Sequence, residues 1–309
     1  MTVSRRAFLK IAGAAGASGA AGLVGRPGEA RAARQGPRWD ETPAMLVDTT
    51  KCVGCRACEA ACSEANRLPD PARAAQEPLF AGKRTSDSRT YTVVNRYLSP
   101  GKDGAKPTFV KTQCMHCVQP ACASACLVSA LEKTPQGPVV YHADRCMGCR
   151  YCMVACPFGV PKFEYEKAVP YIQKCSFCIE RLDQGKLPAC AQVCPSGALQ
   201  FGKRKELLEI AKSRIYQNPD RYVHHIYGEH EVGGTGWLYI SQIPFERLGF
   251  RADLGTRPYP EFTWPFLSAV PFVLMLWPPF LMGLYAFRKG KGETAQGTAG
   301  GEGVETRHE

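Results

Sequence analysis

Sixteen cysteines, confined to four short groups, limit what this 309-residue chain can fold into. A disulfide framework scatters its cysteines along a chain, whereas these are closely spaced within each group. The sequence therefore favours metal binding over disulfides. Every group holds four cysteines, and none is left over: Cys52, Cys55, Cys58 and Cys62; Cys114, Cys117, Cys122 and Cys126; Cys146, Cys149, Cys152 and Cys156; and Cys175, Cys178, Cys190 and Cys194.

The third group has the spacing C-x2-C-x2-C-x3-C-P, ending at Pro157. Zinc knuckles use pairs of C-x2-C, and a third closely spaced thiolate is not needed at a tetrahedral ion already served by two pairs. The spacing is instead typical of bacterial two-cluster ferredoxins, where three thiolates hold one cluster and the fourth reaches a neighbour. Gly148 lets the backbone pass close to such a cluster. Four complete groups predict four 4Fe-4S clusters, with all sixteen cysteines bound to cluster iron.

The N-terminus has the pattern of a twin-arginine export signal, with Arg5 and Arg6 followed by Phe-Leu-Lys. A weakly apolar run rich in Gly and Ala comes next, and a cleavage point follows Ala32. Residues 1–32 are therefore predicted to be a signal peptide, and an uncleaved signal stays an open alternative. Because this route carries folded proteins, clusters can be built in the cytoplasm before export to the periplasm.

A second apolar segment lies near the C-terminus, where residues 262–287 carry no charge. At 1.5 Å per residue this stretch makes a helix of about 39 Å, long enough to cross a membrane. Four prolines within it are expected to kink a lone helix. Arg288, Lys289 and Lys291 follow, so the positive-inside rule puts the cysteines in the periplasm and residues 288–309 in the cytoplasm as a disordered tail.

Residues 33–261 are predicted to form a periplasmic α+β domain made of two bacterial-ferredoxin-like two-cluster units. The inner unit covers about residues 106–165, and the Pro- and Gly-rich residues 67–105 are interpreted as an insertion. The pattern predicts helices at 57–66 and 203–215. Strands are predicted at 44–48, 91–98, 108–111, 139–142, 197–202 and 237–243.

The rest of the sequence argues against other functions. The formal charge is +11, but no basic tract marks a nucleic-acid binder. No glycine-rich phosphate loop, nucleophile elbow or convincing carboxylate pair is present, so we expect no catalysis by the chain alone. Packing and donation to a cluster sulfide are both open for His116. Cations placed to tune cluster potentials are Lys51, Arg56, Arg145, Arg150 and Lys174.

At these motifs the chain resembles the four-cluster electron-transfer subunits of membrane-bound respiratory oxidoreductases. This family includes the formate dehydrogenase and dimethyl sulfoxide reductase types, and the periplasmic iron-sulfur subunit of hydrogenase-2-type nickel-iron hydrogenases is most similar in architecture. The resemblance covers nearly the whole chain. It rests on the export signal, the cysteine groups, QCMHC from Gln113, CRYCMVACPFGVPK from Cys149, IYGEHEVGGT from Ile226 and the single C-terminal anchor.

The resemblance implies a crossed pairing of the cysteines. Departures from the family are Ser63 and Leu127, which stand where a proline often follows the fourth cysteine. They concern the exit turn rather than the ligands. The implied ligand sets are Cys52, Cys55, Cys58 with Cys194; Cys175, Cys178, Cys190 with Cys62; Cys114, Cys117, Cys122 with Cys156; and Cys146, Cys149, Cys152 with Cys126.

The expected function is electron transfer from a periplasmic catalytic subunit, a nickel-iron hydrogenase pair, to a polytopic quinone-reactive membrane subunit. One alternative keeps this role beside a molybdopterin enzyme such as formate dehydrogenase, or beside a multihaem cytochrome. A different class is a redox or oxygen sensor. Four complete clusters argue against it, because sensing needs one exposed labile centre.

Overall fold

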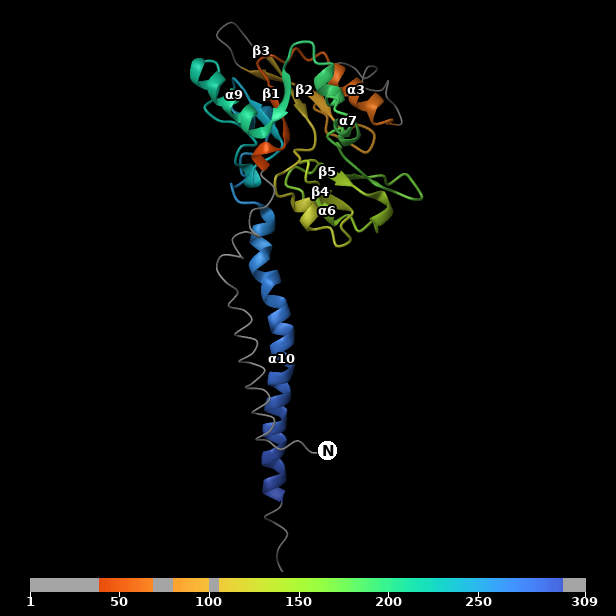
Figure 1. Ribbon diagram of the computed structural model, residues 1–309, viewed down its shortest axis with the longest axis vertical. Helices are drawn as coiled ribbons and strands as arrows, with labels where there is room; N and C mark the ends of the chain where they lie inside the picture. The colour runs from red at the N-terminus through yellow and green to blue at the C-terminus, as the bar shows by residue number, and fades with distance from the viewer. Residues whose placement is uncertain (1–38, 69–79, 100–105, 297–309) are drawn as a thin grey trace, which may run out of the picture.

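The computed structural model describes residues 39–68, 80–99 and 106–296. The predicted signal peptide, residues 1–32, lies outside the described residues, as does part of the predicted insertion. The described chain mixes short helices with short strands, as the α+β prediction expected. One long helix extends away from this cysteine-bearing part (Figure 1).

A three-stranded sheet forms the core of the cysteine-bearing part. Its order is β8 (Leu199–Lys203), β1 (Pro43–Asp48) and β9 (Trp237–Ile240), with β1 antiparallel to β8 and parallel to β9. All four residues of β9 are buried. The strands predicted at 44–48, 197–202 and 237–243 are therefore confirmed, with small shifts at their ends.

Helix α9 (Arg204–Gln217) packs against this sheet. Its apolar face buries Leu207 and Ala211 beside Leu46 and Leu238 of the sheet. These side chains recur at the helical period, which is why the sequence predicted the helix correctly.

Three two-stranded hairpins complete the strand content. They pair β2 (Val93–Ser99) with β3 (Lys106–Thr112), β4 (Leu131–Lys133) with β5 (Val139–Tyr141), and β6 (Lys162–Phe163) with β7 (Ile172–Gln173). The predictions at 91–98, 108–111 and 139–142 match β2, β3 and β5. Strands β4, β6 and β7 were missed, because two or three residues are too few to show a period of two.

Short helices begin within or directly after the cysteine groups. They are α3 (Ala57–Ala65), α5 (Ala121–Ser124), α6 (Tyr151–Ala155), α7 (Ile179–Asp183) and α8 (Ala189–Gln192). Of these the sequence predicted α3, at 57–66. Single 3-10 turns occupy Trp39–Glu41, Ala143–Arg145, Glu231–Gly233 and Phe245–Leu248.

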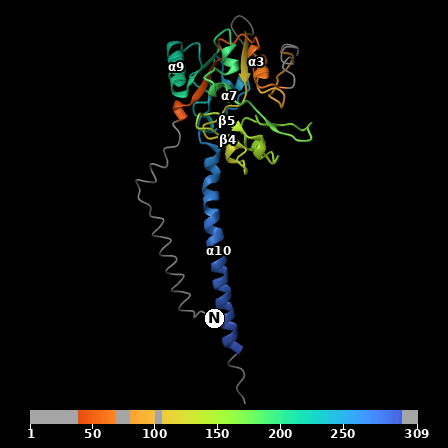
Figure 2. The same cartoon turned by 45° about the vertical axis from the view of Figure 1, so that its right-hand side comes forward.

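Helix α10 (Tyr259–Gln296) is the long helix, and it leaves the cysteine-bearing part in both views (Figures 1 and 2). Residues Tyr259–Arg288 are long and apolar enough to cross a membrane, and the apolar window within them is not buried. The helix contains the predicted span 262–287. It runs through all four internal prolines as one assigned helix, although kinks were expected.

The helix also continues to Gln296, which corrects the prediction of a disordered tail from residue 288. The physical reason is that adding a residue to an existing helix avoids the cost of nucleation, so a long apolar helix carries polar residues beyond its end. Residues 297–309 lie outside the described residues.

Candidate iron-sulfur cluster sites

The four cysteine loops share one backbone feature. Two residues after the first cysteine, the chain enters the left-handed region, at Gly54 (φ 71°), His116 (φ 47°), Gly148 (φ 74°) and Phe177 (φ 57°). Such a residue reverses the chain direction. The loop therefore curls, and the two cysteines on either side lie on the same side of it.

Strand pairing explains how distant cysteines meet. In the β1–β8 pair, Val47 lies opposite Leu199, so Cys52 after β1 and Cys194 before β8 are both connected to the same end of the strand pair. In the β4–β5 hairpin, Leu131 lies opposite Tyr141, so Cys126 before β4 and Cys146 after β5 are likewise connected to one end. Each pairing thus brings a fourth cysteine back toward the first cysteine of another group.

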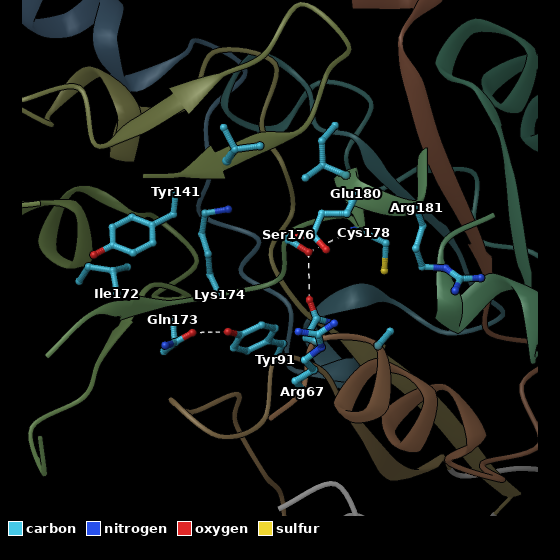
Figure 3. A pocket seen from close by; sticks show the side chains of 14 residues that line it. Arg67, Tyr91, Tyr141, Ile172, Gln173, Lys174, Ser176, Cys178, Glu180 and Arg181 are labelled. Atoms are coloured by element: carbon cyan, nitrogen blue, oxygen red, sulfur yellow. Dashed lines mark hydrogen bonds between the residues drawn. The ribbon is translucent and has the colours of Figure 1, made fainter. Parts of the chain in front are cut away.

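The electrostatics of the buried thiols show which cysteines are neighbours. Burial raises the pKa of Cys62 well above its ordinary value, and among the cysteines the charges of Cys175, Cys190 and Cys178 raise it further. Cys62 comes from the first group and these three come from the fourth. Hydrogen bonds strengthen this link, since Asn66 Nδ2 lies 2.7 Å from the Cys62 carbonyl and Ser176 Oγ lies 3.1 Å from Asn66 Oδ1 (Figure 3).

The second and third groups exchange a cysteine in the same way. Burial raises the pKa of Cys117, and the charges of Cys114, Cys156 and Cys122 add to the rise. Burial also raises the pKa of Cys152 to about 11, with further contributions from Cys126, Cys146 and Cys149.

The sixteen cysteines therefore fall into four neighbouring sets, which we call quartets 1 to 4. Quartet 1 also rests on Cys52, whose pKa is raised by burial and then by the charges of Cys194 and Cys55. The sets agree with the crossed pairing that the sequence resemblance implies. They are quartet 1, Cys52, Cys55, Cys58 and Cys194; quartet 2, Cys62, Cys175, Cys178 and Cys190; quartet 3, Cys114, Cys117, Cys122 and Cys156; and quartet 4, Cys126, Cys146, Cys149 and Cys152.

Two quartets line small cavities of their own. All four members of quartet 1 line one cavity, together with Val47, Val94 and Lys111. All four members of quartet 4 line another, beside Leu131 and Ile172. These linings are mostly apolar apart from the sulfur atoms, as expected for a buried cluster site.

The chemistry of the donors fits iron-sulfur clusters. Burial raises the pKa of Cys58, Cys122 and Cys175 to about 12, so these thiols stay protonated at neutral pH unless a cationic metal centre offsets their charge. Across residues 39–68, 80–99 and 106–296, no three His, Cys, Asp or Glu side chains gather closely enough for a single metal ion. Such spacing is compatible with a cluster of several irons, which spreads its thiolates around a cube.

Hydrogen bonds already reach several sulfur atoms. Backbone N–H groups donate to Sγ of Cys126 from Ala130 (3.1 Å), of Cys146 from Gly148 (3.4 Å) and of Cys175 from Phe177 (3.4 Å). Bonds of this kind stabilise thiolate charge and raise the reduction potential of a bound cluster.

Neighbouring quartets share packed cysteines. Cys58 packs in one cluster of side chains with Cys190, Cys114 in another with Cys175, and Cys122 in a third with Cys152, which gives the order of neighbours 1, 2, 3, 4. Helices α3 and α7, which follow cysteines of quartets 1 and 2, lie far from α10 in both views. Helix α6, which contains Cys152 of quartet 4, and the β4–β5 hairpin, which lies between Cys126 and Cys146 in sequence, are on the side where α10 begins (Figure 1).

A larger polar cleft with about 970 Å³ of empty space opens beside quartet 2, between the end of α3, strand β7 and helix α7 (Figure 3). Tyr91 donates a hydrogen bond to Gln173 across it. Cys178 is the one cysteine on its wall, so the cleft gives quartet 2 a route to solvent.

The cations expected to tune the clusters differ in their surroundings. Arg56 is buried, lines the cavity of quartet 1 and pairs with Glu59 (3.1 Å), which also pairs with Arg84. Arg150 lies over the ring of Phe163 and lines the cavity of quartet 4, whereas Arg145 is half-exposed near Glu132 and Lys51 is exposed. A tuning role stays a prediction for these cations, and Arg56 and Arg150 are the two that line cluster cavities.

Lys174 is buried as Arg56 is. Its ammonium group donates to the carbonyls of Val139 and Cys175 (3.0 Å for the latter). The sequence reasoning missed two further cations, the buried Lys111 and the partly buried Lys133. One sequence signal for Lys111 was present. In an extended chain, side chains two residues apart lie on the same face, so Lys111 of β3 shares a face with Gln113, which directly precedes Cys114.

His116 packs into the core, and donation from its ring to a cluster sulfide stays open. Its ring stacks edge-on to Phe177, at 5.0 Å between ring centres, and its Nδ1 accepts the Val139 N–H at 3.0 Å. Burial lowers the pKa of His116 well below its ordinary value, so the ring is neutral and carries its proton on Nε2. That buried nitrogen has no hydrogen-bond partner among the described residues.

The sequence of this chain is similar to those of several known proteins. The family model described as a 4Fe-4S dicluster domain matches residues 105–204. A protein of Nitratidesulfovibrio vulgaris is 49% identical over 95% of this chain and 79% of its own length. The hydrogenase-2 operon protein HybA of Escherichia coli O157:H7 is 40% identical over 70% of this chain and 75% of its own length.

The nitrate-inducible formate dehydrogenase iron-sulfur subunit of Escherichia coli K12 is 34% identical, over 64% of this chain and 67% of its own length. Fold, cysteine sites and matches together define the class, that of 4Fe-4S proteins that transfer electrons within oxidoreductase complexes. Within this class, the chain belongs to the family of HybA-like iron-sulfur electron-transfer subunits.

Proposed function

We propose that this chain relays electrons through four 4Fe-4S clusters, from a periplasmic catalytic subunit to a quinone-reactive membrane subunit. The observation that carries the proposal is the order of neighbouring quartets, 1 to 4, with quartet 4 on the side of the molecule where α10 begins. A succession of neighbouring sites suits transfer between two partners at opposite ends. When bound, the clusters supply one-electron redox chemistry.

The chain's own residues have three tasks in this relay. Each quartet holds one cluster, and the crossed cysteines Cys62, Cys126, Cys156 and Cys194 tie neighbouring loops together. Quartets 3 and 4 come from residues 114–156 and form the inner unit, while quartets 1 and 2 form the outer one. Apolar side chains such as Val47 and Leu131 exclude water from the sites.

The placement in the cell rests on the two ends of the chain. The Arg5–Arg6 pattern supports export of residues 33–261 to the periplasm, and the charge-free residues 262–287 within α10 support a single membrane anchor with its C-terminal end in the cytoplasm. The chain itself then needs no substrate site, because the chemistry takes place on its partners.

Hydrogen is the preferred electron donor, through a nickel-iron hydrogenase pair, since the HybA match is stronger than the matches to formate dehydrogenase subunits. Formate oxidised by a molybdopterin enzyme is the second candidate, supported by the 34% identical relative. A multihaem cytochrome partner stays an alternative from the sequence.

The test compares quinone reduction by membranes that contain or lack this chain, with hydrogen and formate supplied separately. We expect hydrogen-dependent quinone reduction to fall to background without the chain and to return when the gene is restored. Loss of formate-dependent transfer alone would refute the hydrogenase assignment and retain the relay. Full activity with both donors in the absence of the chain would refute the relay.

A further inference from the structure

Lys111 of strand β3 is a buried cation with no acidic partner. Its residue is 2% exposed, and its Nζ donates to Gln113 Oε1 at 2.7 Å. The same nitrogen lies 4.4 Å from the centre of the Trp237 ring. Within the described part of the chain, no carboxylate forms an ion pair with it. Burying an ammonium group without a counter-charge costs several kcal/mol, so something nearby must compensate it.

The position of this ammonium group is fixed by a closed ring of hydrogen bonds. Gln113 Nε2 donates to the Tyr239 hydroxyl at 2.7 Å, and that hydroxyl donates to the backbone carbonyl of Lys111 at 3.0 Å. Gln113 and Tyr239 are both buried. The cation is thus held in one place by two strands of different sheets, rather than moving as a surface lysine does.

Cysteine sulfur is the main source of negative charge acting on this cation among the described residues. Lys111 lines the cavity that the four members of quartet 1 enclose. Burial lowers the pKa of Lys111, but the charges of Cys190, Cys58, Cys175 and Cys62 more than offset it and raise that pKa overall. The cation therefore lies at the site of quartet 1, and three of the four cysteines whose charges act on it belong to quartet 2.

A neighbouring cation shows the contrast. Arg56 is also buried beside quartet 1, but Glu59 bonds to it and also pairs with Arg84. Arg56, Arg84 and Glu59 therefore carry one net positive charge between them, whereas the charge of Lys111 has no carboxylate paired with it among the described residues. The difference between the two cations does not concern iron binding, because Lys111 is not a cluster ligand.

We propose that Lys111 is a positioning residue whose fixed positive charge raises the reduction potentials of the clusters in quartets 1 and 2 together. This inference rests on the proposed relay and deepens it. The physical reason is that gaining one electron adds one negative charge to a cluster, and a nearby buried cation stabilises that added charge. The outer end of the relay is thereby made easier to reduce.

The test is a potentiometric titration, monitored by electron paramagnetic resonance, of the anaerobically purified complex with the full-length chain. Lys111→Met removes the charge at similar volume, and Lys111→Arg keeps it. Lys212→Met is the control, because Lys212 is 59% exposed on α9 and pairs with Glu229. The two signals lost in Cys58→Ser and Cys178→Ser variants identify the centres of quartets 1 and 2.

We expect Lys111→Met to lower the reduced-to-oxidised ratio of both centres about tenfold at a fixed potential, which for one electron is ~59 mV. The centres of quartets 3 and 4 should shift far less, Lys111→Arg should restore the ratio, and Lys212→Met should leave it unchanged. Unchanged potentials in Lys111→Met with full iron content would overturn the inference and leave the relay standing.

If Lys111→Met loses iron, its comparison with Lys111→Arg separates the effect of charge from the effect of packing. If Lys111→Met loses these two clusters while Lys111→Arg keeps them at wild-type potentials, the charge is what the site requires, and the inference holds. If both variants lose iron, Lys111 acts through packing and the inference is wrong. A wild-type complex that lacks the two centres would overturn the relay, and the inference with it.

Discussion

At the scale of single residues, left-handed backbone positions decide where the sulfur atoms point. Gly54 and Gly148 occupy equivalent places in the first and third cysteine groups, and both have positive φ. Their surroundings differ, since a Cβ on Gly54 would lie 2.4 Å from the Phe109 ring, whereas on Gly148 the nearest atom, from Phe163, is 3.8 Å away. Comparing substitutions at these two glycines therefore distinguishes the cost of backbone strain from the cost of steric overlap.

Gly54→Ala should therefore destabilise the protein more than Gly148→Ala. Both variants place a side chain at positive φ, at a cost of about 1–2 kcal/mol, and only Gly54→Ala also displaces the Phe109 ring. Thermal unfolding under anaerobic conditions measures the difference, with Gly82→Ala as a control that meets no atom within 4 Å. Equal shifts for Gly54→Ala and Gly148→Ala would contradict the steric account.

The crossed pairing predicts an effect on the neighbouring group. Cys156→Ser should disturb the cluster held by Cys114, Cys117 and Cys122 and leave the centre of quartet 4 intact, although Cys156 follows Cys152 in sequence. Cys149→Ser is the matched variant and should affect quartet 4 instead. Mössbauer and paramagnetic resonance spectra count the surviving centres. Loss of the quartet 4 signal in Cys156→Ser would refute the crossing.

Sequence spacing identified the cysteines because iron-sulfur ligands come from short local loops. It missed Lys111, since a buried cation is set by strands that are far apart in sequence, and its burial depends on Trp237 and Tyr239. It did place Arg56 beside a cluster site, since Arg56 lines the cavity of quartet 1. The sequence reasoning did not note its partner Glu59, which is visible as an i, i+3 pair.

At the scale of elements, helix α10 is the one helix in the described part of the chain that is long and apolar enough to span a membrane. Its apolar window is not buried, and side chains such as Trp264, Phe266 and Met275 are 70% exposed or more. In water such a surface is unfavourable by about 25 cal/mol per Å². The element therefore needs lipid or partner helices around it.

Truncation after Glu261 tests this reading of α10. The shortened chain, with its signal removed and without partner subunits, should fold, keep its clusters and stay in the supernatant when membranes are sedimented. The full-length chain is the control and should sediment with the membranes. A truncated chain that still partitions into the bilayer would show that α10 is not the anchor.

The longer elements could be predicted because burial imposes a period on their sequence, as in β1 and α9. The short helices α5 and α8 could not, since four residues show no period. A signal for both was nevertheless present, because the letters PACA occur at Pro120 and again at Pro188, where each proline caps its helix. A search for internal repeats would have found the pair.

At the scale of the whole molecule, two strand pairings, β1 with β8 and β4 with β5, bring a fourth cysteine back toward the first cysteine of another group, at quartets 1 and 4. The sequence predicted how many quartets there are, and the resemblance implied their pairing. Their order along the molecule required the structure, because it depends on how the loops pack beside one another.

Iron and sulfide analysis of the anaerobically prepared full-length chain, with spectra recorded on the same sample, tests the four-cluster relay most directly. Four complete quartets predict about sixteen iron atoms per chain and four distinct 4Fe-4S centres. A folded preparation that holds about eight irons or fewer would contradict the account, since at least two quartets would then bind no cluster.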